Sequence, residues 1–233
     1  MSEQPVTLIT GTRTGIGRYL VDHYLGKGHL VFGCSRNPLG EELPGYEHFC
    51  LDVSDESAIK NMLSAVRQKC GRLDHLINNA GIAATGHFLL TPAETLLRVY
   101  KTNVIGTFLF TREAAKLMKK SPHGRIVNFS SSAVPLKLAG ESVYASSKAA
   151  LVSLTEITAR ELAPYGITVN TVGPTPIETD LIRAMPQDKV QDVIARQPIR
   201  RLGTLADVTN VIDFFLRPES DFITGQTIYL GGF

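Results

Sequence analysis

The stretch Val6-Thr7-Leu8-Ile9-Thr10-Gly11-Thr12-Arg13-Thr14-Gly15-Ile16-Gly17 decides the fold of this chain of 233 residues. Its first four residues predict a short strand, and residues 15–27 have the pattern of a helix. Glycines in the turn between them let the backbone approach a ligand, because a Cβ atom would block that approach or forbid the turn. The N–H groups that open the helix would then point at a phosphate. The stretch therefore predicts a phosphate-binding turn; the alternative is a tight structural turn, which uses the same residues.

Short apolar runs alternate with helical patterns along the whole chain, which predicts an α/β fold: a doubly wound parallel sheet of about seven strands with helices on both faces. The expected strands are Val6–Ile9, Leu30–Gly33, His48–Leu51, His75–Asn78, Arg125–Phe129, Ile167–Val172 and Thr227–Leu230, and the expected helices are 15–27, 55–70, 91–119, 142–163 and 205–217. Thr91 and Thr204 are expected to cap two of these helices. Without repeats or linkers, residues 1–233 form one expected domain. Its proline-punctuated stretch 175–203 is an expected substrate lid.

Composition excludes several classes of protein. The chain has 24 Lys and Arg against 22 Asp and Glu, a net charge of +2 without blocks of like charge, which argues against nucleic acid as the main partner. No apolar run approaches the roughly 20 residues of a membrane span, and no secretory signal is visible. Cys34, Cys50 and Cys70 form no short pair, and the six histidines lack metal-ligand spacing. We therefore expect a reduced, cytoplasmic protein without a metal or a membrane partner.

The end of the second expected strand, Gly33-Cys34-Ser35-Arg36-Asn37, indicates which dinucleotide would bind. An acidic residue about 20 residues past the glycines would bind a free ribose 2′-hydroxyl, whereas arginine accommodates a 2′-phosphate. No acidic residue is present in this segment. Arg36 can form paired hydrogen bonds with a phosphate, and Ser35 can donate another. The segment favours NADP(H) over NAD(H); the alternative is that Arg36 is an ordinary solvated surface residue.

A second constellation indicates proton transfer. Tyr144 and Lys148 are four residues apart at the start of an expected helix, so they share one face. A neighbouring ammonium would lower the pKa of the phenol and make proton exchange feasible nearer neutral pH. Ser131 follows an apolar strand, where ligands bind in open α/β sheets, so its hydroxyl is placed to hold a substrate oxygen. Ser130 and Ser132 are the alternatives for that role, and a surface pair is the alternative for Tyr144 and Lys148.

Together these motifs resemble those of the short-chain dehydrogenase/reductase family, in the branch of short single-domain members. Overall the chain is most similar to bacterial 3-oxoacyl-carrier-protein reductases. The resemblance also includes Asp52-Val53, Asn78-Asn79-Ala80-Gly81, Asn103-Val104-x-Gly106, Pro174 with Ile177 and Thr179, Arg201-Leu202-Gly203 and Ile223-Thr224-Gly225-Gln226. It implies a Rossmann-type sheet with the strand order 3-2-1-4-5-6-7. The chain departs from the family pattern at Thr175-Pro176, where a glycine usually follows Pro174.

The resemblance implies a role for each matching residue. Tyr144 would be the general acid in reduction, Lys148 would lower its pKa and hold the nicotinamide ribose, Ser131 would bind the carbonyl, and Asn103 would position a water that relays protons. The implied residues of the NADP(H) site are Gly11, Arg13, Thr14, Gly15, Ile16, Gly17, Ser35, Arg36, Asp52, Val53, Asn79, Ala80, Gly81, Tyr144, Lys148, Pro174, Ile177 and Thr179. The alternatives are a helix cap for Asp52, turn formation for Asn79 and backbone bridging for Asn103.

The expected activity is NADP(H)-dependent reduction of a carbonyl on a small or carrier-linked substrate. Oxidoreduction of a sugar or polyol is the alternative, and a catalytically silent NADP(H)-binding protein is a third. Substrate contacts are expected from 82–90, 133–143 and the lid, where Leu136, Leu138, Ile182 and Met185 predict an apolar pocket, and Arg183, Lys189, Arg196, Arg200 and Arg201 could meet an anionic carrier or face water. By resemblance, helices 91–119 and 142–163 would pair in a homo-oligomer, a dimer or a tetramer. The apolar residues of 91–119 are too widely spread for one core stripe, which fits a second buried face; they include Leu97, Val104, Phe108 and Leu117.

Overall fold

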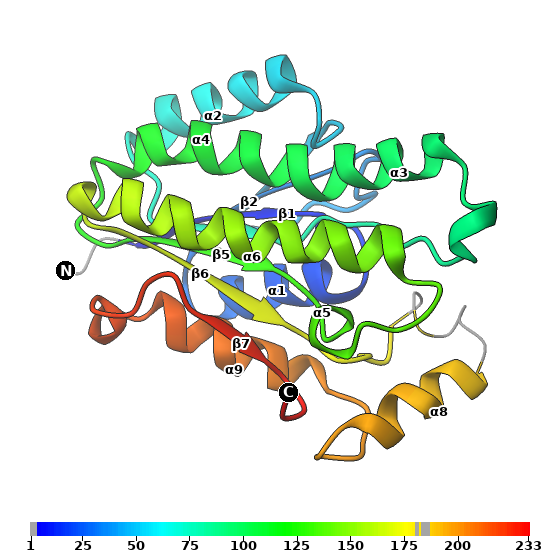
Figure 1. Ribbon diagram of the computed structural model, residues 1–233. Helices are drawn as coiled ribbons and strands as arrows, with labels where there is room; N and C mark the ends of the chain where they lie inside the picture. Colours follow the sequence, from blue (N-terminus) through cyan, green and yellow to red (C-terminus); the bar gives the residue numbers. More distant parts are fainter. Residues whose placement is uncertain (1–3, 180–181, 183–186) are drawn as a thin grey trace.

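A seven-stranded parallel sheet forms the centre of the computed structural model, which describes residues 4–179, 182 and 187–233. The strand order is β3-β2-β1-β4-β5-β6-β7, which confirms the expected fold class and order (Figure 1). The strands are β1 (Val6–Thr10), β2 (Leu30–Ser35), β3 (Tyr46–Cys50), β4 (His75–Asn78), β5 (Gly124–Phe129), β6 (Ile167–Gly173) and β7 (Thr227–Tyr229). Each expected strand is present; the bounds of β4 are as predicted, and those of the other strands differ by one or two residues.

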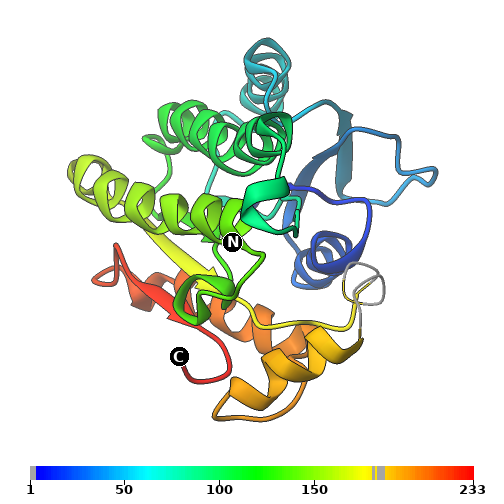
Figure 2. The same ribbon diagram turned by 45° about the vertical axis from the view of Figure 1, so that its right-hand side comes forward.

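Helices cover both faces of the sheet (Figures 1 and 2). One layer contains α2 (Glu56–Cys70), α4 (Gly106–Met118) and α6 (Ser142–Leu162), and the other contains α1 (Gly15–Gly26) and α9 (Leu205–Leu216). In the part of the chain that the structure describes, the other α-helices are α3 (Ala93–Tyr100), α5 (Ala133–Leu136) and α8 (Gln187–Arg196), and short 3-10 turns cover Phe88–Leu90, Ala163–Tyr165 and Pro218–Ser220. None of the helices in the described residues is long and apolar enough to cross a membrane.

The alternation of side chains along the central strands explains why the sequence contains apolar runs. Leu8 of β1 belongs to the core on the α2 and α4 side, and its neighbour Ile9 belongs to the core on the α1 and α9 side. Leu76 and Ile77 of β4 divide in the same way. Because helices cover both faces of a parallel sheet, consecutive residues are buried and the strand reads as a continuous apolar run.

Residues 101–105 interrupt the helix that the sequence predicted over 91–119. The chain forms α3, then a π-helical turn over Lys101–Ile105, and then α4. The expected cap at Thr91 is also wrong, because the Thr91 hydroxyl donates to the carbonyl of His87 (3.0 Å) and Pro92 occupies the cap position. The cap at Thr204 is confirmed, since Thr204 and Asp207 form a reciprocal capping box.

Helix α8 is an element that the sequence did not predict. It lies within the stretch 175–203, on the side toward which the strands point and apart from both helical layers (Figure 1). Val190 and Val193 are its buried apolar residues. Arg183 and Met185, which the sequence placed near the substrate, lie outside the described residues.

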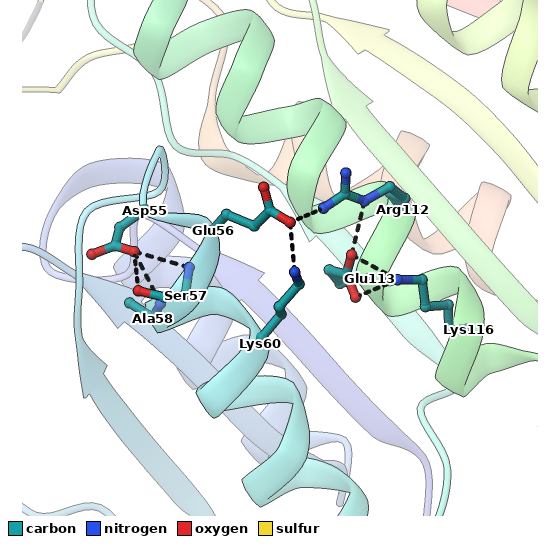
Figure 3. Close-up of polar contacts among 8 residues, drawn as sticks. All are labelled: Asp55, Glu56, Ser57, Ala58, Lys60, Arg112, Glu113 and Lys116. Carbon is teal, nitrogen blue, oxygen red and sulfur yellow. Dashed lines mark hydrogen bonds and ion pairs between the residues drawn. The ribbon is translucent and has the colours of Figure 1, made fainter.

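An ion pair between Glu56 and Arg112 joins α2 to α4 and supports the layer that these two helices form (Figure 3). Glu56 of α2 accepts from Arg112 of α4 (2.8 Å), and Arg112 also donates to the buried Glu113 (2.8 Å). Burial alone would raise the pKa of Glu113, but hydrogen bonds from Lys116 and Arg112 hold it below its ordinary value. Asp55 caps α2 by accepting from two backbone N–H groups of the first turn.

Candidate active site

A cleft of about 650 Å³ lies at the carboxyl ends of the central strands. Residues that directly follow β1, β4, β5 and β6 line it, among them Gly11, Asn79, Ser131 and Pro174. Ligands bind at this edge of open α/β sheets, and the volume is typical of a pocket for a small ligand or cofactor. The cleft brings together all the predicted site residues except Asn103, which lies behind it.

The glycine turn after β1 has the shape of a phosphate cradle. Gly11 and Gly15 have φ angles of +74° and +59°, a region that favours glycine. A Cβ atom on Gly17 would lie 2.0 Å from the carbonyl oxygen of Gly11. No side chain caps α1, which begins after Thr14, so its first N–H groups are available to an anion. The side chain of Thr179 lies close to Gly15, across the same cradle.

Asn79 braces this turn from β4. Its Nδ2 atom donates to the carbonyl oxygens of Thr10 (2.9 Å) and Gly11 (3.1 Å). The next residue, Ala80, donates its N–H to Thr10 Oγ1 (3.0 Å). Asn79 also lines the cleft, so this predicted cofactor-site residue holds the cradle in place as well.

Two cationic side chains, those of Arg13 in the glycine turn and Arg36 after β2, also belong to the cleft. Both are exposed and line the cleft, and neither has a hydrogen bond or ion pair with any described residue. The Asp52 carboxylate accepts from the Ser54 N–H (2.8 Å) and hydroxyl (2.6 Å), and these bonds hold its pKa below the ordinary value. Asp55 rather than Asp52 caps α2, so the cap alternative for Asp52 is wrong.

Tyr144 and Lys148 lie in the first turns of α6, on one side of the cleft. The Lys148 ammonium donates to the carbonyl of Phe129 (2.8 Å) and lies 5.9 Å from the centre of the Tyr144 ring. Burial lowers the pKa of Lys148 to about 8. Burial also raises the pKa of Tyr144, which the hydrogen bond with Ser131 opposes and the charge of Glu141 reinforces. The net shift of the Tyr144 pKa is upward because desolvation of the phenol is its largest cause, and a lowering by Lys148 stays a prediction.

The three consecutive serines after β5 have different surroundings. Ser130 donates its hydroxyl to the carbonyl of Lys148 (3.2 Å), and Ser132 is buried. Ser131 is partly exposed to the cleft and is the serine whose hydroxyl pairs with Tyr144. This arrangement favours Ser131 over its neighbours as the group that meets a substrate oxygen.

Asn103 lies in the π-helical turn, fully buried, and its amide is bonded to the protein on both sides. Its Oδ1 accepts from the N–H of Ile82 (2.9 Å), and its Nδ2 donates to the Ile82 carbonyl (3.0 Å) and to Ser147 Oγ (3.0 Å). Ser147 in turn donates to the carbonyl of Tyr144 (2.7 Å). The side chain thus bridges the loop after β4 and the first turn of α6, which favours the bridging alternative for this amide. π-helical turns occur often at functional sites.

The end of the cleft beside Tyr144 is largely apolar. Leu136, Leu138 and Val193 line it. They belong to 133–143 and to the expected lid, two of the segments from which the sequence predicted substrate contacts. The carboxylate of Glu141 also lines this end; its segment was expected to contact substrate, but no motif identified the residue. Within the described part of the chain, no group of His, Cys, Asp and Glu side chains could hold a metal ion.

A parallel sheet of this order, with a glycine cradle and a Tyr–Lys pair at its carboxyl edge, defines a Rossmann-type oxidoreductase. The model of the family described as enoyl-(acyl carrier protein) reductase matches residues 12–232. The chain belongs to this family, which lies within the short-chain dehydrogenases/reductases and binds a nicotinamide cofactor.

Curated relatives and solved structures agree with this assignment. The chain is 32% identical to the 3-oxoacyl-[acyl-carrier-protein] reductase FabG of Escherichia coli (strain K12), over 99% of this chain and 97% of the relative. It is 35% identical to the FabG of Thermotoga maritima, with the same coverage. The solved structure of ElxO with NADP bound has a TM-score of 0.89 at 30% identity, covering 97% of both chains. NAD⁺-bound xylitol dehydrogenase also has a TM-score of 0.89, at 27% identity over the whole of both chains.

Proposed function

We propose that this protein is an NADP(H)-dependent ketoreductase that reduces a carbonyl group to a secondary alcohol. The observation that carries the proposal is the pair of hydroxyls on Tyr144 and Ser131, which lies beside Lys148 in a cleft whose far end contains Arg13 and Arg36. A pair of hydroxyl donors suits an oxygen that gains negative charge during reduction.

The residues of the cleft fit the cofactor. The cradle of Gly11 to Gly17, which a Cβ atom would fill, would hold the pyrophosphate. Arg13 and Arg36 would hold the 2′-phosphate, and Ser35 would support them. Further contacts would come from Asp52 and Val53 to the adenine, from Asn79, Ala80 and Gly81 to the adenosine ribose, and from Pro174, Ile177 and Thr179 to the nicotinamide half. NADPH supplies the hydride for the reduction.

In the proposed reduction, the protein orients the substrate and transfers one proton to its oxygen. Ser131 donates a hydrogen bond from Oγ to the substrate oxygen, and Tyr144 transfers its phenolic proton to that oxygen as its charge develops. The raised pKa of Tyr144 keeps this proton in place at neutral pH. Lys148 is held by the Phe129 carbonyl beside the Tyr144 ring, and its positive charge stabilises the phenolate that is left after the proton transfer. The backbone around Asn103 would position a water through which the proton is restored.

Two classes of substrate agree with different observations. The names of the curated relatives favour a β-ketoacyl group on a carrier, and the apolar wall of Leu136, Leu138 and Val193 would accept an acyl chain. A sugar or polyol is the second candidate, because the Glu141 carboxylate could accept hydrogen bonds from hydroxyls and because two solved relatives are an aldohexose dehydrogenase and a xylitol dehydrogenase.

Oxidation of NADPH with a panel of carbonyl compounds tests the proposal. Turnover of acetoacetyl thioesters would support the first substrate class, and turnover of keto sugars alone would support the second. Tyr144→Phe should lower kcat by about 10²–10⁴ while NADPH still binds, because it removes the proton donor and leaves the cradle intact. If the wild type binds NADPH but turns over no carbonyl, or if Tyr144→Phe retains full activity, the proposal fails.

Cofactor preference has its own test. Arg36→Asp should shift the ratio of kcat/KM for NADPH over NADH by at least about tenfold toward NADH, because it replaces a cation by a carboxylate that repels the phosphate. The matched change is Arg196→Asp, at an arginine of the expected lid that pairs with Asp192. It should leave the ratio within about twofold of the wild-type value, because substitutions at distant sites act independently. An unchanged ratio for Arg36→Asp would contradict the NADP(H) assignment.

We also propose that the protein works in the cytoplasm as a dimer or tetramer. Large apolar side chains of one helical layer are exposed in the single chain, among them Leu97, Ile105, Phe108 and Ile157. Leu117 is different, since it is buried in the chain's own core. Covering this apolar face against a second copy would remove it from water. Sedimentation equilibrium at micromolar protein checks the proposal, and a monomer would contradict it.

A further inference from the structure

A chain of hydrogen bonds joins the two segments that contain Arg13 and Arg36. Thr12 Oγ1 lies 2.7 Å from the hydroxyl of Tyr46, and this hydroxyl lies 2.8 Å from Nδ1 of His48. On the other side of the imidazole, Nε2 lies 3.1 Å from both Ser35 Oγ and the carbonyl oxygen of Asn37. Thr12 directly precedes Arg13, and Ser35 and Asn37 flank Arg36. The edge strand β3 thus connects the glycine turn to the end of β2.

The Asn37 carbonyl assigns a direction to the hydrogen bonds of His48 and Tyr46. The carbonyl of Asn37 can only accept, so His48 Nε2 carries the hydrogen and Nδ1 is the acceptor. Tyr46 therefore donates to Nδ1, and the Thr12 hydroxyl, which lies 2.7 Å from the Tyr46 oxygen and 3.3 Å from the Cys34 carbonyl oxygen, shares its hydrogen between these two acceptors. Burial lowers the pKa of His48 and raises the pKa of Tyr46 to about 12, so both side chains are neutral near pH 7.

The backbone makes room for this arrangement. A Cβ atom on Gly33 of β2 would lie 2.3 Å from the Tyr46 hydroxyl and 2.8 Å from Thr12 Oγ1. Glycine within a strand marks a place where another group approaches closely. Neither Tyr46 nor His48 lines the cleft, so these two side chains act on the cleft only through the residues that they hold.

We propose that Tyr46 and His48 are positioning residues for the cofactor 2′-phosphate: they hold the Thr12–Arg13 and Ser35–Asn37 segments in register, so that Arg13 and Arg36 meet one phosphate. This inference rests on the proposed NADP(H) preference. Arg13 and Arg36 are exposed and form no hydrogen bond or ion pair with the described residues, so the positions of their backbones depend on the contacts of the residues beside them. Precise placement of two guanidinium groups matters because their hydrogen bonds to phosphate are directional.

The test compares the dissociation constants of NADPH and NADH, which differ in the 2′-phosphate alone, by titration of nicotinamide fluorescence. Tyr46→Phe removes the donor to Nδ1, and His48→Leu removes the whole bridge. Each variant should weaken NADPH binding by about 5- to 20-fold and change NADH binding by less than about twofold, as expected for the loss of one or two hydrogen bonds that serve only the phosphate. His48→Gln, which keeps an amide donor and acceptor, should restore part of the NADPH affinity.

Glu47→Gln is the matched control. Glu47 lies between Tyr46 and His48 on the same strand, but its carboxylate pairs with Lys69 of α2 on the other face of the sheet (2.7 Å). This variant should bind both cofactors as the wild type does. A general loss of structure would weaken both cofactors equally and would contradict the positioning role.

The outcomes separate the inference from the proposed function. If the wild type prefers NADPH and the variants at Tyr46 and His48 lose that preference, the positioning role is supported. If the wild type prefers NADPH and the variants keep the preference, the positioning role is refuted while the proposed cofactor stands. If the wild type binds NADH as tightly as NADPH, the proposed preference and the positioning role both fail.

Discussion

Gly17 offers the sharpest test of the glycine cradle. A Cβ atom at this position would lie 2.0 Å from the Gly11 carbonyl oxygen and 2.5 Å from Asn79 Nδ2. An ordinary carbon–oxygen contact is above about 3 Å, so the backbone of Gly11 or the start of α1 must move by about 1 Å to admit the methyl group of Gly17→Ala. The amide of Asn79 lies in the same place, so its bonds to Thr10 and Gly11 are disturbed as well.

The expected effect has two parts. Overpacking costs about 1–3 kcal/mol of unfolding free energy, and weakening the two hydrogen bonds of Asn79 acts in the same direction. A cradle displaced by about 1 Å also loses the alignment of its N–H groups with the phosphates, so NADPH should bind at least about tenfold more weakly to Gly17→Ala. The matched control is Gly26→Ala in the same helix, where a Cβ atom meets nothing within 4 Å. Gly26→Ala should be neutral or more stable by up to about 1 kcal/mol.

Urea denaturation and fluorescence titration with NADPH measure both quantities for the two variants. The reasoning requires Gly17→Ala to lose stability and affinity while Gly26→Ala loses neither. If Gly17→Ala unfolds with the wild-type midpoint and binds NADPH within about twofold of the wild type, the close packing of Gly17 against Gly11 is refuted.

Two further predictions follow from the pKa directions. Reduction needs protonated Tyr144, so the rate of reduction should fall as the pH rises through the pKa of that residue. Glu141→Gln removes a negative charge that raises this pKa, so the fall in rate should move to lower pH. An unchanged pH profile would contradict the coupling between Glu141 and Tyr144. His75 has a pKa lowered by burial to about 3, against an ordinary 6.5, so the unfolded chain binds a proton that the folded chain refuses and stability is lost as the pH falls below about 6.5. At pH 5 this loss is about 2 kcal/mol of unfolding free energy. Urea denaturation should therefore show a smaller decrease in unfolding free energy between pH 7 and pH 5 for His75→Gln than for the wild type. An equal decrease would contradict the role of His75.

The strands and most helices were predictable because their patterns are local. Val6–Thr10 is buried along its whole length, so its composition alone identifies a central strand. Helix α8 was missed because it has few buried apolar side chains, Val190 and Val193 among them, and a helix with a narrow apolar face resembles a loop in sequence. The π-helical turn at Lys101–Ile105 was missed because apolar spacing does not record a shift in the hydrogen bonds of the backbone.

The candidate site was predictable wherever chemistry requires a particular residue type at a short spacing. Gly17 and the pair of Tyr144 and Lys148 meet this condition, and the cleft brings them together. Tyr46 and His48 do not, because their partners lie on other segments and no motif contains them. The one local signal was Gly33, whose absent Cβ atom makes room for the Tyr46 hydroxyl. The need for glycine at this position becomes clear only in the folded sheet, where β2 and β3 lie side by side.

The net charge of +2 conceals an uneven distribution along the cleft. Arg13 and Arg36 lie with the Asp52 carboxylate at the end proposed for the 2′-phosphate, and the Lys148 ammonium and the Glu141 carboxylate lie at the end beside Tyr144. At the first end the two guanidinium groups outweigh Asp52 and attract a phosphate, which orients a dinucleotide before any close contact forms. At the second end Lys148 is bonded to the Phe129 carbonyl, and the Glu141 carboxylate is the charge that acts on Tyr144. The same carboxylate disfavours a substrate with an anionic group next to its carbonyl. A carrier-linked substrate would satisfy this condition, because its anionic phosphates lie far from the reacting carbonyl, and so would a neutral sugar.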